Sequence, residues 1–129
     1  MSTRIFLSTP TTGRLDLAER KAFFQQMADR LHQLYPGAEI VSPLDEIDTF
    51  ISDTRKRQGC NPTQAQFMRR ELLLLLTCDV ICLDRRGLHI SARCEAEHYT
   101  ATTCGLDVIF YQNIAGPHPL TPPEITQHP

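Results

Sequence analysis

Four short apolar runs, separated by segments with a helical pattern, limit the folds that this chain can adopt. The runs are RIFLS at residues 4–8, AEIVS at 38–42, DVICL at 79–83 and DVIFY at 107–111. Helices are predicted between them, at 15–34, 63–77 and 91–104. Strands that alternate with helices favour a parallel sheet joined by right-handed crossovers. We therefore predict one α/β domain, doubly wound in the flavodoxin or Rossmann-like manner, with a short parallel sheet and helices on both faces.

Two segments lie outside this alternation. The polar stretch from Pro43 to Pro62 is about twenty residues long, which in a compact domain indicates a lid, a binding loop or a short helix near residues 44–51. After Asn113 the chain holds five of its nine prolines. We expect a domain at residues 1–113, followed at 114–129 by a proline-rich tail that is disordered or lies across a neighbouring subunit.

Composition excludes several classes of function. With 13 basic and 15 acidic residues the chain has a net charge of -2, so it lacks the positive field that attracts a nucleic acid polymer. It contains neither a long apolar run nor a signal peptide, and we expect a cytoplasmic protein without membrane contact. The five cysteines form no C-x-x-C pair and the five histidines lack ligand spacing, so we expect buried free thiols and no metal or other cofactor.

The helix predicted at 63–77 contains five successive leucines, Leu72 to Leu76. Successive leucines point in different directions around a helix, so its apolar surface is too wide for one sheet to cover. We therefore expect a homodimer or a larger homo-oligomer that packs through this helix.

Two glutamates lie in apolar helical surroundings. The helical neighbours of Glu97 are small residues suited to close packing against the sheet, which would partly desolvate its carboxylate. Those of Glu71 are large and apolar, a setting that favours a raised pKa or a partner. The alternative for Glu71 is an ordinary surface pair with Arg69, Arg70 or another cation.

The loops that follow the strands carry residues suited to an anion. Ser91 begins a predicted helix, whose free backbone N–H groups could bind a phosphate beside Ser8 to Gly13. The alternative is that Ser91 only caps the helix and that Thr11, Thr12 and Gly13 only turn the chain.

Arg93 falls in the first turn of the same helix, where a cation opposes the helix dipole unless an anion compensates it. A ligand phosphate, supported by Arg85 and Arg86, is one candidate partner. The other candidates are the acids Glu97, Asp84 and Glu95.

Taken together, these segments resemble the nucleoside 2-deoxyribosyltransferase-like superfamily and, within it, the small DUF4406-type proteins. The matching stretches are RIFLSTPTTG at 4–13, RREL at 69–72, CDVICL at 78–83, Ser91, Glu97 and residues 105–109. The resemblance covers most of residues 4–111.

This resemblance implies an N-glycosidase or deoxyribosyltransferase that acts on a nucleoside or 5′-nucleotide through a covalent glycosyl-enzyme intermediate. Glu97 takes the position of the nucleophile that attacks the anomeric carbon. Glu71 takes that of the acid that assists the leaving base. Ser91 takes that of the serine that contacts the sugar or 5′-phosphate. The implied substrate-binding residues are Ser8, Thr9, Thr12, Gly13, Ser91 and Arg93, and a neighbouring subunit supplies part of each site.

The chain departs from the family pattern at three positions. Thr9 and Arg93 replace glycines that let the ligand approach the backbone, and Glu71 replaces an aspartate. A nucleotide-binding or sensing protein that has lost turnover is therefore the competing hypothesis, and an oligomeric scaffold without a ligand is a third. A Glu97 carboxylate that is free in an open pocket favours the enzyme, and one that is tied to Arg93 or another cation favours the sensing protein.

Overall fold

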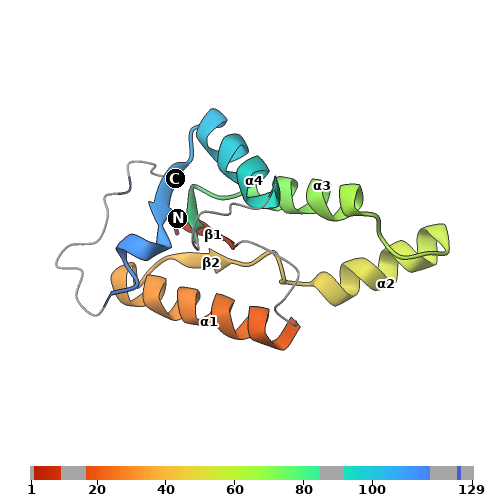
Figure 1. Cartoon of the computed structure of the whole chain (residues 1–129), viewed down its shortest axis with the longest axis horizontal. Helices are drawn as coiled ribbons and strands as arrows, with labels where there is room; N and C mark the ends of the chain where they lie inside the picture. Colours follow the sequence, from red (N-terminus) through yellow and green to blue (C-terminus); the bar gives the residue numbers. More distant parts are fainter. Residues whose placement is uncertain (1, 10–16, 85–91, 117–124, 126–129) are drawn as a thin grey trace.

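Four parallel strands and four α-helices alternate in the computed structural model, which describes residues 2–9, 17–84, 92–116 and 125 (Figure 1). The strands are β1 (Arg4–Ser8), β2 (Glu39–Val41), β3 (Val80–Leu83) and β4 (Asp107–Phe110). The helices are α1 (Leu17–Leu34), α2 (Ile47–Gln58), α3 (Gln64–Leu75) and α4 (Ala92–Thr103), and a short 3₁₀ helix η1 (Tyr111–Asn113) follows β4. The predicted α/β fold class is confirmed.

The sheet has the strand order β2-β1-β3-β4, with every neighbouring pair parallel. From β1 the chain passes outward to β2, and from β3 it passes outward in the opposite direction to β4. The direction of winding therefore reverses between β1 and β3, as it does in doubly wound folds. Ser8 and Leu83 pair at the carboxyl ends of these two strands, and ligands of open α/β sheets bind in the crevice beyond such a point.

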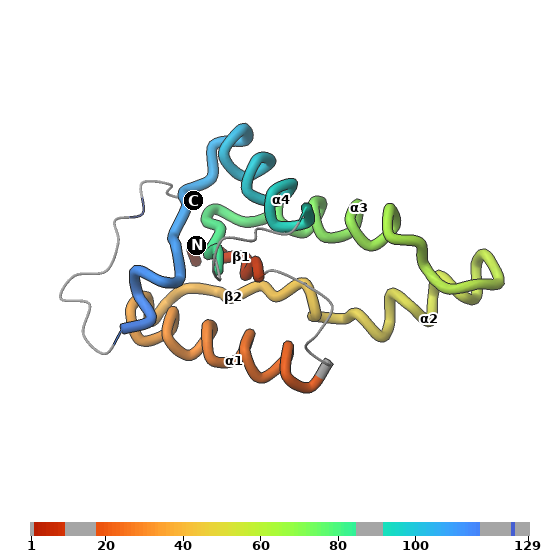
Figure 2. Tube along the Cα trace, in the orientation of Figure 1, coloured from red at the N-terminus to blue at the C-terminus, as the bar shows by residue number. Residues whose placement is uncertain are grey.

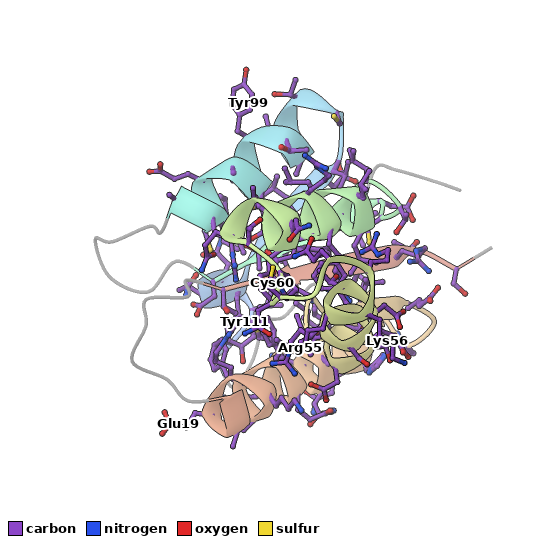
Figure 3. The ribbon with its side chains drawn as sticks, turned by 90° about the vertical axis from the view of Figure 1, so that its right-hand side faces the viewer. Glu19, Arg55, Lys56, Cys60, Tyr99 and Tyr111 are labelled. Carbon is purple, nitrogen blue, oxygen red and sulfur yellow. The ribbon has the colours of Figure 1, made fainter. Side chains whose placement is uncertain are left out.

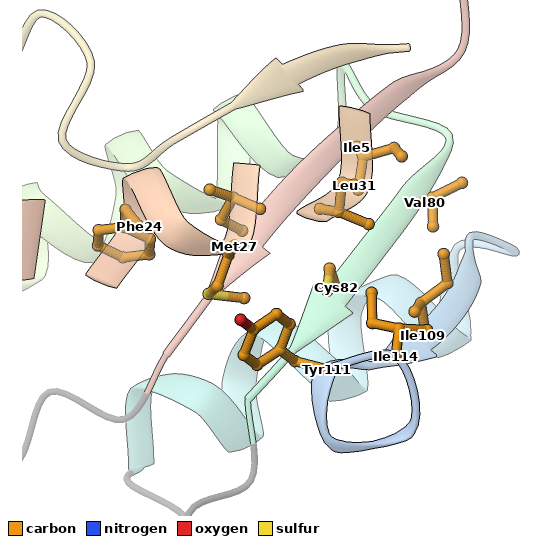
Figure 4. Packing of buried hydrophobic residues seen from close by; sticks show 10 residues of the cluster. Ile5, Phe24, Met27, Leu31, Val80, Cys82, Ile109, Tyr111 and Ile114 are labelled. Carbon is orange, nitrogen blue, oxygen red and sulfur yellow. The ribbon is translucent and has the colours of Figure 1, made fainter. Parts of the chain in front are cut away.

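Helices cover both faces of the sheet, as predicted, because alternate residues of each strand point to opposite sides. In β1, Ile5 and Leu7 pack with Met27 and Leu31 of α1 in one buried cluster (Figure 4). Phe6 packs on the other face, in a second cluster to which α3 and α4 contribute. Figure 1 accordingly shows α1 on one side of the sheet and α3 with α4 on the other.

The polar stretch after β2 forms helix α2, which runs beyond the 44–51 range expected for a short helix there. Gly59 ends it with φ 79°, a left-handed conformation that glycine adopts without steric cost. Helix α3 then begins with a capping box in which Thr63 and Gln66 bond reciprocally to each other's backbone N–H groups. Figure 2 shows that α2 and α3 extend as a helical pair beyond the ends of the strands.

The end of the described chain packs against the α1 face. Ile114 is fully buried, and Ile125 lies partly buried against the same cluster, although both belong to the segment expected to form a tail. Arg30 of α1 holds this region by donating hydrogen bonds to the carbonyls of Ile114 and Gly116.

The expectation of buried free thiols is correct for three of the five cysteines. Cys78, Cys82 and Cys94 are buried, whereas Cys60 and Cys104 are exposed.

Candidate functional site

Ser8, the last residue of β1, joins the carboxyl edge of the sheet to helix α4. Its backbone carbonyl accepts a hydrogen bond from the N–H of Asp84, at 2.9 Å, which ties β1 to the residue after β3. Its hydroxyl donates to Glu97 Oε1, also at 2.9 Å, and lies 3.4 Å from Cys94 Sγ. The structure therefore brings the Glu97 carboxyl to the switch point of the sheet.

Glu97 is almost completely enclosed, with 1% of its surface exposed. Its second carboxyl oxygen, Oε2, is buried and has no hydrogen-bond partner among the described atoms. Burial and the nearby charge of Glu71 raise the pKa of Glu97 to about 8, against the smaller opposing effects of the Ser8 hydroxyl and the Arg93 charge. At neutral pH the Glu97 carboxyl is therefore mainly protonated.

Glu71 of α3 is the second buried acid, with 2% of its surface exposed. Its Oε2 lies 3.2 Å from Nε of Arg93 in an ion pair, yet no described donor completes a hydrogen bond to this oxygen. Burial raises the pKa of Glu71, and the charges of Arg93, Arg20 and Arg70 oppose this rise. These cations favour the ionised form of Glu71, whereas burial and the charge of Glu71 favour the protonated form of Glu97.

The acid that pairs with Arg93 is Glu71, which was not among the three acids named from the sequence as candidate partners. Glu97 bonds to Ser8 instead. Asp84, 2% exposed, accepts a hydrogen bond from Gln112, and Glu95 is exposed. For Glu71 the sequence indicated a raised pKa or a partner, with a surface ion pair as the alternative; its pKa is raised and its pair with Arg93 is buried on the glutamate side.

A cavity of about 270 Å³ opens next to the ion pair. Its apolar wall comes from the segment between β2 and α3 and from Phe67 of α3, and its charged wall comes from α1, α3 and α4. The lining residues are Arg20, Leu44, Ile47, Asp48, Ile51, Gln64, Phe67, Glu71 and Arg93. Glu97 is absent from this lining, so its carboxyl is neither free in an open pocket nor tied to Arg93.

The structure thus groups four of the residues predicted for the site, namely Ser8, Glu71, Arg93 and Glu97. The Ser8 hydroxyl is occupied by Glu97, so Ser8 positions an acid in addition to any contact with substrate. Thr9, the next residue along the chain, is also buried, with 9% of its surface exposed. Thr12, Gly13, Ser91, Arg85 and Arg86 lie outside the described residues.

Arg20 of α1 also belongs to this region, although no pattern in the sequence points to it. Its Nε is buried without an acceptor among the described atoms, and it lines the same cavity as Glu71 and Arg93. In the sequence it is one charged residue among the exposed positions of an amphipathic helix, and only the fold brings it close to Glu71 and Arg93.

Helix α3 exposes part of its leucine run. Leu75 is fully buried, whereas Leu73 and Leu76 are 61% and 47% exposed. Tyr99 of α4 is also exposed, and Figure 3 shows it projecting away from the other helices.

Comparison with known proteins bears on the fold. The chain is similar to the crystal structure of a conserved protein from Enterococcus faecalis V583, with a TM-score of 0.65 and 16% sequence identity. The match covers 85% of this chain and 63% of that protein, so this chain spans less than two thirds of the neighbour's length. This likeness shows the fold. No known protein-family model matches the sequence, and no curated protein does.

Two further findings concern membranes and metals. None of the helices in the described residues is long and apolar enough to cross a membrane. The same residues contain no group of three or more histidine, cysteine, aspartate or glutamate side chains placed to hold a metal ion.

Proposed function

We propose that the protein cleaves the N-glycosidic bond of a nucleoside or 5′-nucleotide, as an N-glycosidase or deoxyribosyltransferase. The observation that carries this proposal is the pair of buried carboxyl groups, Glu97 and Glu71, at the carboxyl edge of the sheet. Two carboxyl groups with different environments are the minimal equipment for cleavage at an anomeric carbon through a covalent intermediate. The resemblance in sequence supports the same assignment.

In the first step Glu97 is the nucleophile. Its Oε2, which has no hydrogen-bond partner among the described atoms, forms a bond to the anomeric carbon while the carbon–nitrogen bond breaks. The electron pair of that bond goes to the base, which takes a proton from Glu71. In the second step water, or a second base, attacks the anomeric carbon, Glu71 accepts the proton and the Glu97 carboxylate leaves.

One proton shared by the two acids meets the needs of this cycle. The resting pair carries it on Glu97, because Glu71 lies against Arg93. The reactive form carries the same proton on Glu71, so the two forms differ only in where the proton is held. Bound substrate therefore has to favour transfer of the proton from Glu97 to Glu71. Movement of Arg93 away from Glu71 is the simplest way to achieve this.

The test is a search for released base. The protein is incubated with ribonucleosides, 2′-deoxyribonucleosides and their 5′-monophosphates, and free base is measured by chromatography. We expect release from at least one substrate, loss of release in Glu97→Gln, and wild-type release in the matched control Glu95→Gln, which changes an exposed acid of the same helix.

The covalent intermediate gives a second measurement. Mass spectrometry of acid-quenched protein should detect a sugar adduct on a peptide that contains Glu97. Absence of base release from the whole panel, or release that survives Glu97→Gln, would remove the proposal.

A nucleotide-binding or sensing protein without turnover is the second candidate. The observation that favours it is the resting state itself, in which Glu97 is protonated and Glu71 is held by Arg93. This candidate predicts saturable nucleotide binding by calorimetry with no base release, even at high protein concentration.

We further propose that the protein acts in the cytoplasm as a homodimer or larger homo-oligomer that packs through α3. The exposed side chains of Leu73 and Leu76 support this contact, because apolar side chains grouped on one helix are typical of interaction surfaces.

A further inference from the structure

The cavity beside Glu71 has two chemically different walls. Leu44, Ile47, Ile51 and Phe67 provide apolar surface, and Phe67 is held by an edge-to-face contact with Phe50, with 5.5 Å between ring centroids. The opposite wall carries Arg20 and Arg93 with Glu71. Such a cavity fits a small ligand that has an apolar part and a charged part.

The charges on the second wall do not balance. Two guanidinium groups share one buried carboxylate, and Arg93 is the one that forms the ion pair. None of the ion pairs among the described residues involves Arg20, whose Nε is buried without an acceptor. Asp48, the other acid of the lining, is exposed to solvent and forms no ion pair within the described part of the chain.

The two arginines also act on each other. Burial, together with the positive charge of Arg93, lowers the pKa of Arg20, and Glu71 only partly offsets this. Arg20 stays charged at physiological pH, since an arginine guanidinium is not deprotonated in proteins. A second anion between the two guanidiniums would remove the repulsion and supply the missing acceptor.

We propose that Arg20 and Arg93 bind the anionic group of a small ligand whose apolar part lies against Ile47, Ile51 and Phe67. The ligand group is a phosphate monoester or a carboxylate, because both present paired oxygens that match the planar fork of an arginine. The identification of this ligand with the substrate rests on the proposed function, whereas the anion site itself does not.

Three probes of similar size separate charge from shape. Phenyl phosphate, benzoate and benzyl alcohol share a ring and differ in their polar group, and their binding is followed by ligand-observed NMR and by calorimetry on the full chain. We expect both anions, or one of them, to bind at least about tenfold more tightly than benzyl alcohol. Preference for phenyl phosphate identifies a phosphate monoester as the natural group, and preference for benzoate identifies a carboxylate.

Variants test the assignment to Arg20. Arg20→Met should lower the affinity for the preferred anion by at least about tenfold, and Arg20→Lys should lose less. Arg69→Met is the matched control, because it removes the same charge from an exposed position of α3 and should bind as wild type does.

Stability without ligand distinguishes a binding role from a structural one. The Nε of Arg20 is buried without an acceptor among the described atoms, and a buried polar group without a partner destabilises the fold, so ligand-free Arg20→Met should unfold at the same temperature as wild type or above it. A lower unfolding temperature would mean that Arg20 serves the fold, and the proposal would be wrong. Equal binding of benzyl alcohol and the anions, no binding of any probe, or unchanged anion binding in Arg20→Met would overturn it as well.

The anion site and the proposed activity fail in different ways. Anion binding without base release would leave this inference standing and remove the enzyme. Base release without anion binding would leave the proposed activity standing and remove this inference.

Discussion

Arg93 Nε and Glu71 Oε2 lie 3.2 Å apart, and this ion pair joins the first turn of α4 to the middle of α3. The glutamate side chain is 3% exposed and the arginine 21%. The buried charge of Glu71 is therefore paired with an arginine that still reaches solvent. The loss of this pair should change the stability of the fold by a measurable amount.

Arg93→Ala leaves the Glu71 carboxylate buried without its main counterion. We expect the free energy of unfolding to fall by about 2–3 kcal/mol, below the range for a fully buried pair because Arg93 is partly solvated. Adding Glu71→Gln to this variant should recover most of the loss. Chemical denaturation of both single variants and the double variant measures this coupling, and losses that simply add would show that the two side chains do not interact.

Glu97 predicts a stability that falls as pH rises. Its pKa in the fold is about 8, against an ordinary value of 4.5, so between these values the folded state holds a proton that the unfolded state has lost. The free energy of unfolding should decrease across this window by at most about 1.4 kcal/mol per pH unit from this group. Glu97→Gln should lack that contribution. Parallel pH profiles in wild type and variant would contradict the assignment.

The proposed activity predicts an alkaline limit. The pair of acids needs one shared proton, and it loses this proton as pH rises through the pKa of Glu97, about 8. Release of base, measured as kcat/KM, should therefore fall above pH 8. A rate that keeps rising between pH 8 and 10 would show that the cycle uses no acid from this pair.

Ser8→Ala removes the hydroxyl that donates to buried Glu97 Oε1. We expect a loss of about 1–3 kcal/mol in the free energy of unfolding, since the carboxyl is left without this partner. The alkaline limit of activity should also move to higher pH, because the hydroxyl lowers the pKa of Glu97. Ser2→Ala, at an exposed position, is the control and should change neither quantity.

Leu73→Glu tests the contact through α3. The side chain is 61% exposed, so the substitution should leave the folded protomer intact and place a charge in the interface. Light scattering at micromolar concentration should show an oligomer for wild type and a monomer for the variant. A monomeric wild type would remove the homo-oligomer from the proposal.

The sequence was informative about the fold because each strand forms a short apolar run and glycine or proline lies in every break except the one between α3 and β3. The alternation of β1, α1 and β2 follows from local patterns alone. Helix α2 was harder to predict because it is mainly polar, with one buried residue, Thr54. Its apolar pattern is therefore weak, although Gly59 marks its end.

The candidate site was only partly accessible from the sequence. The small neighbours of Glu97 indicated burial, and this is observed for Cys94 and Ala101. The partner of Arg93 could not be found in this way, because Glu71 is 22 positions away and reaches it only when α3 packs beside α4. Arg20 was missed for the same reason, since long-range electrostatic contacts leave no periodic pattern.

The hydrogen bond from Ser8 to Glu97 spans 89 positions of the chain. During synthesis the first strand therefore leaves the ribosome with its serine hydroxyl unpaired, and it stays so until helix α4 has emerged. The buried carboxyl pair is among the last features of the domain to form. A truncation between residues 84 and 96 yields a chain that retains three of the four strands and lacks Glu97, so that it has no paired acids at all.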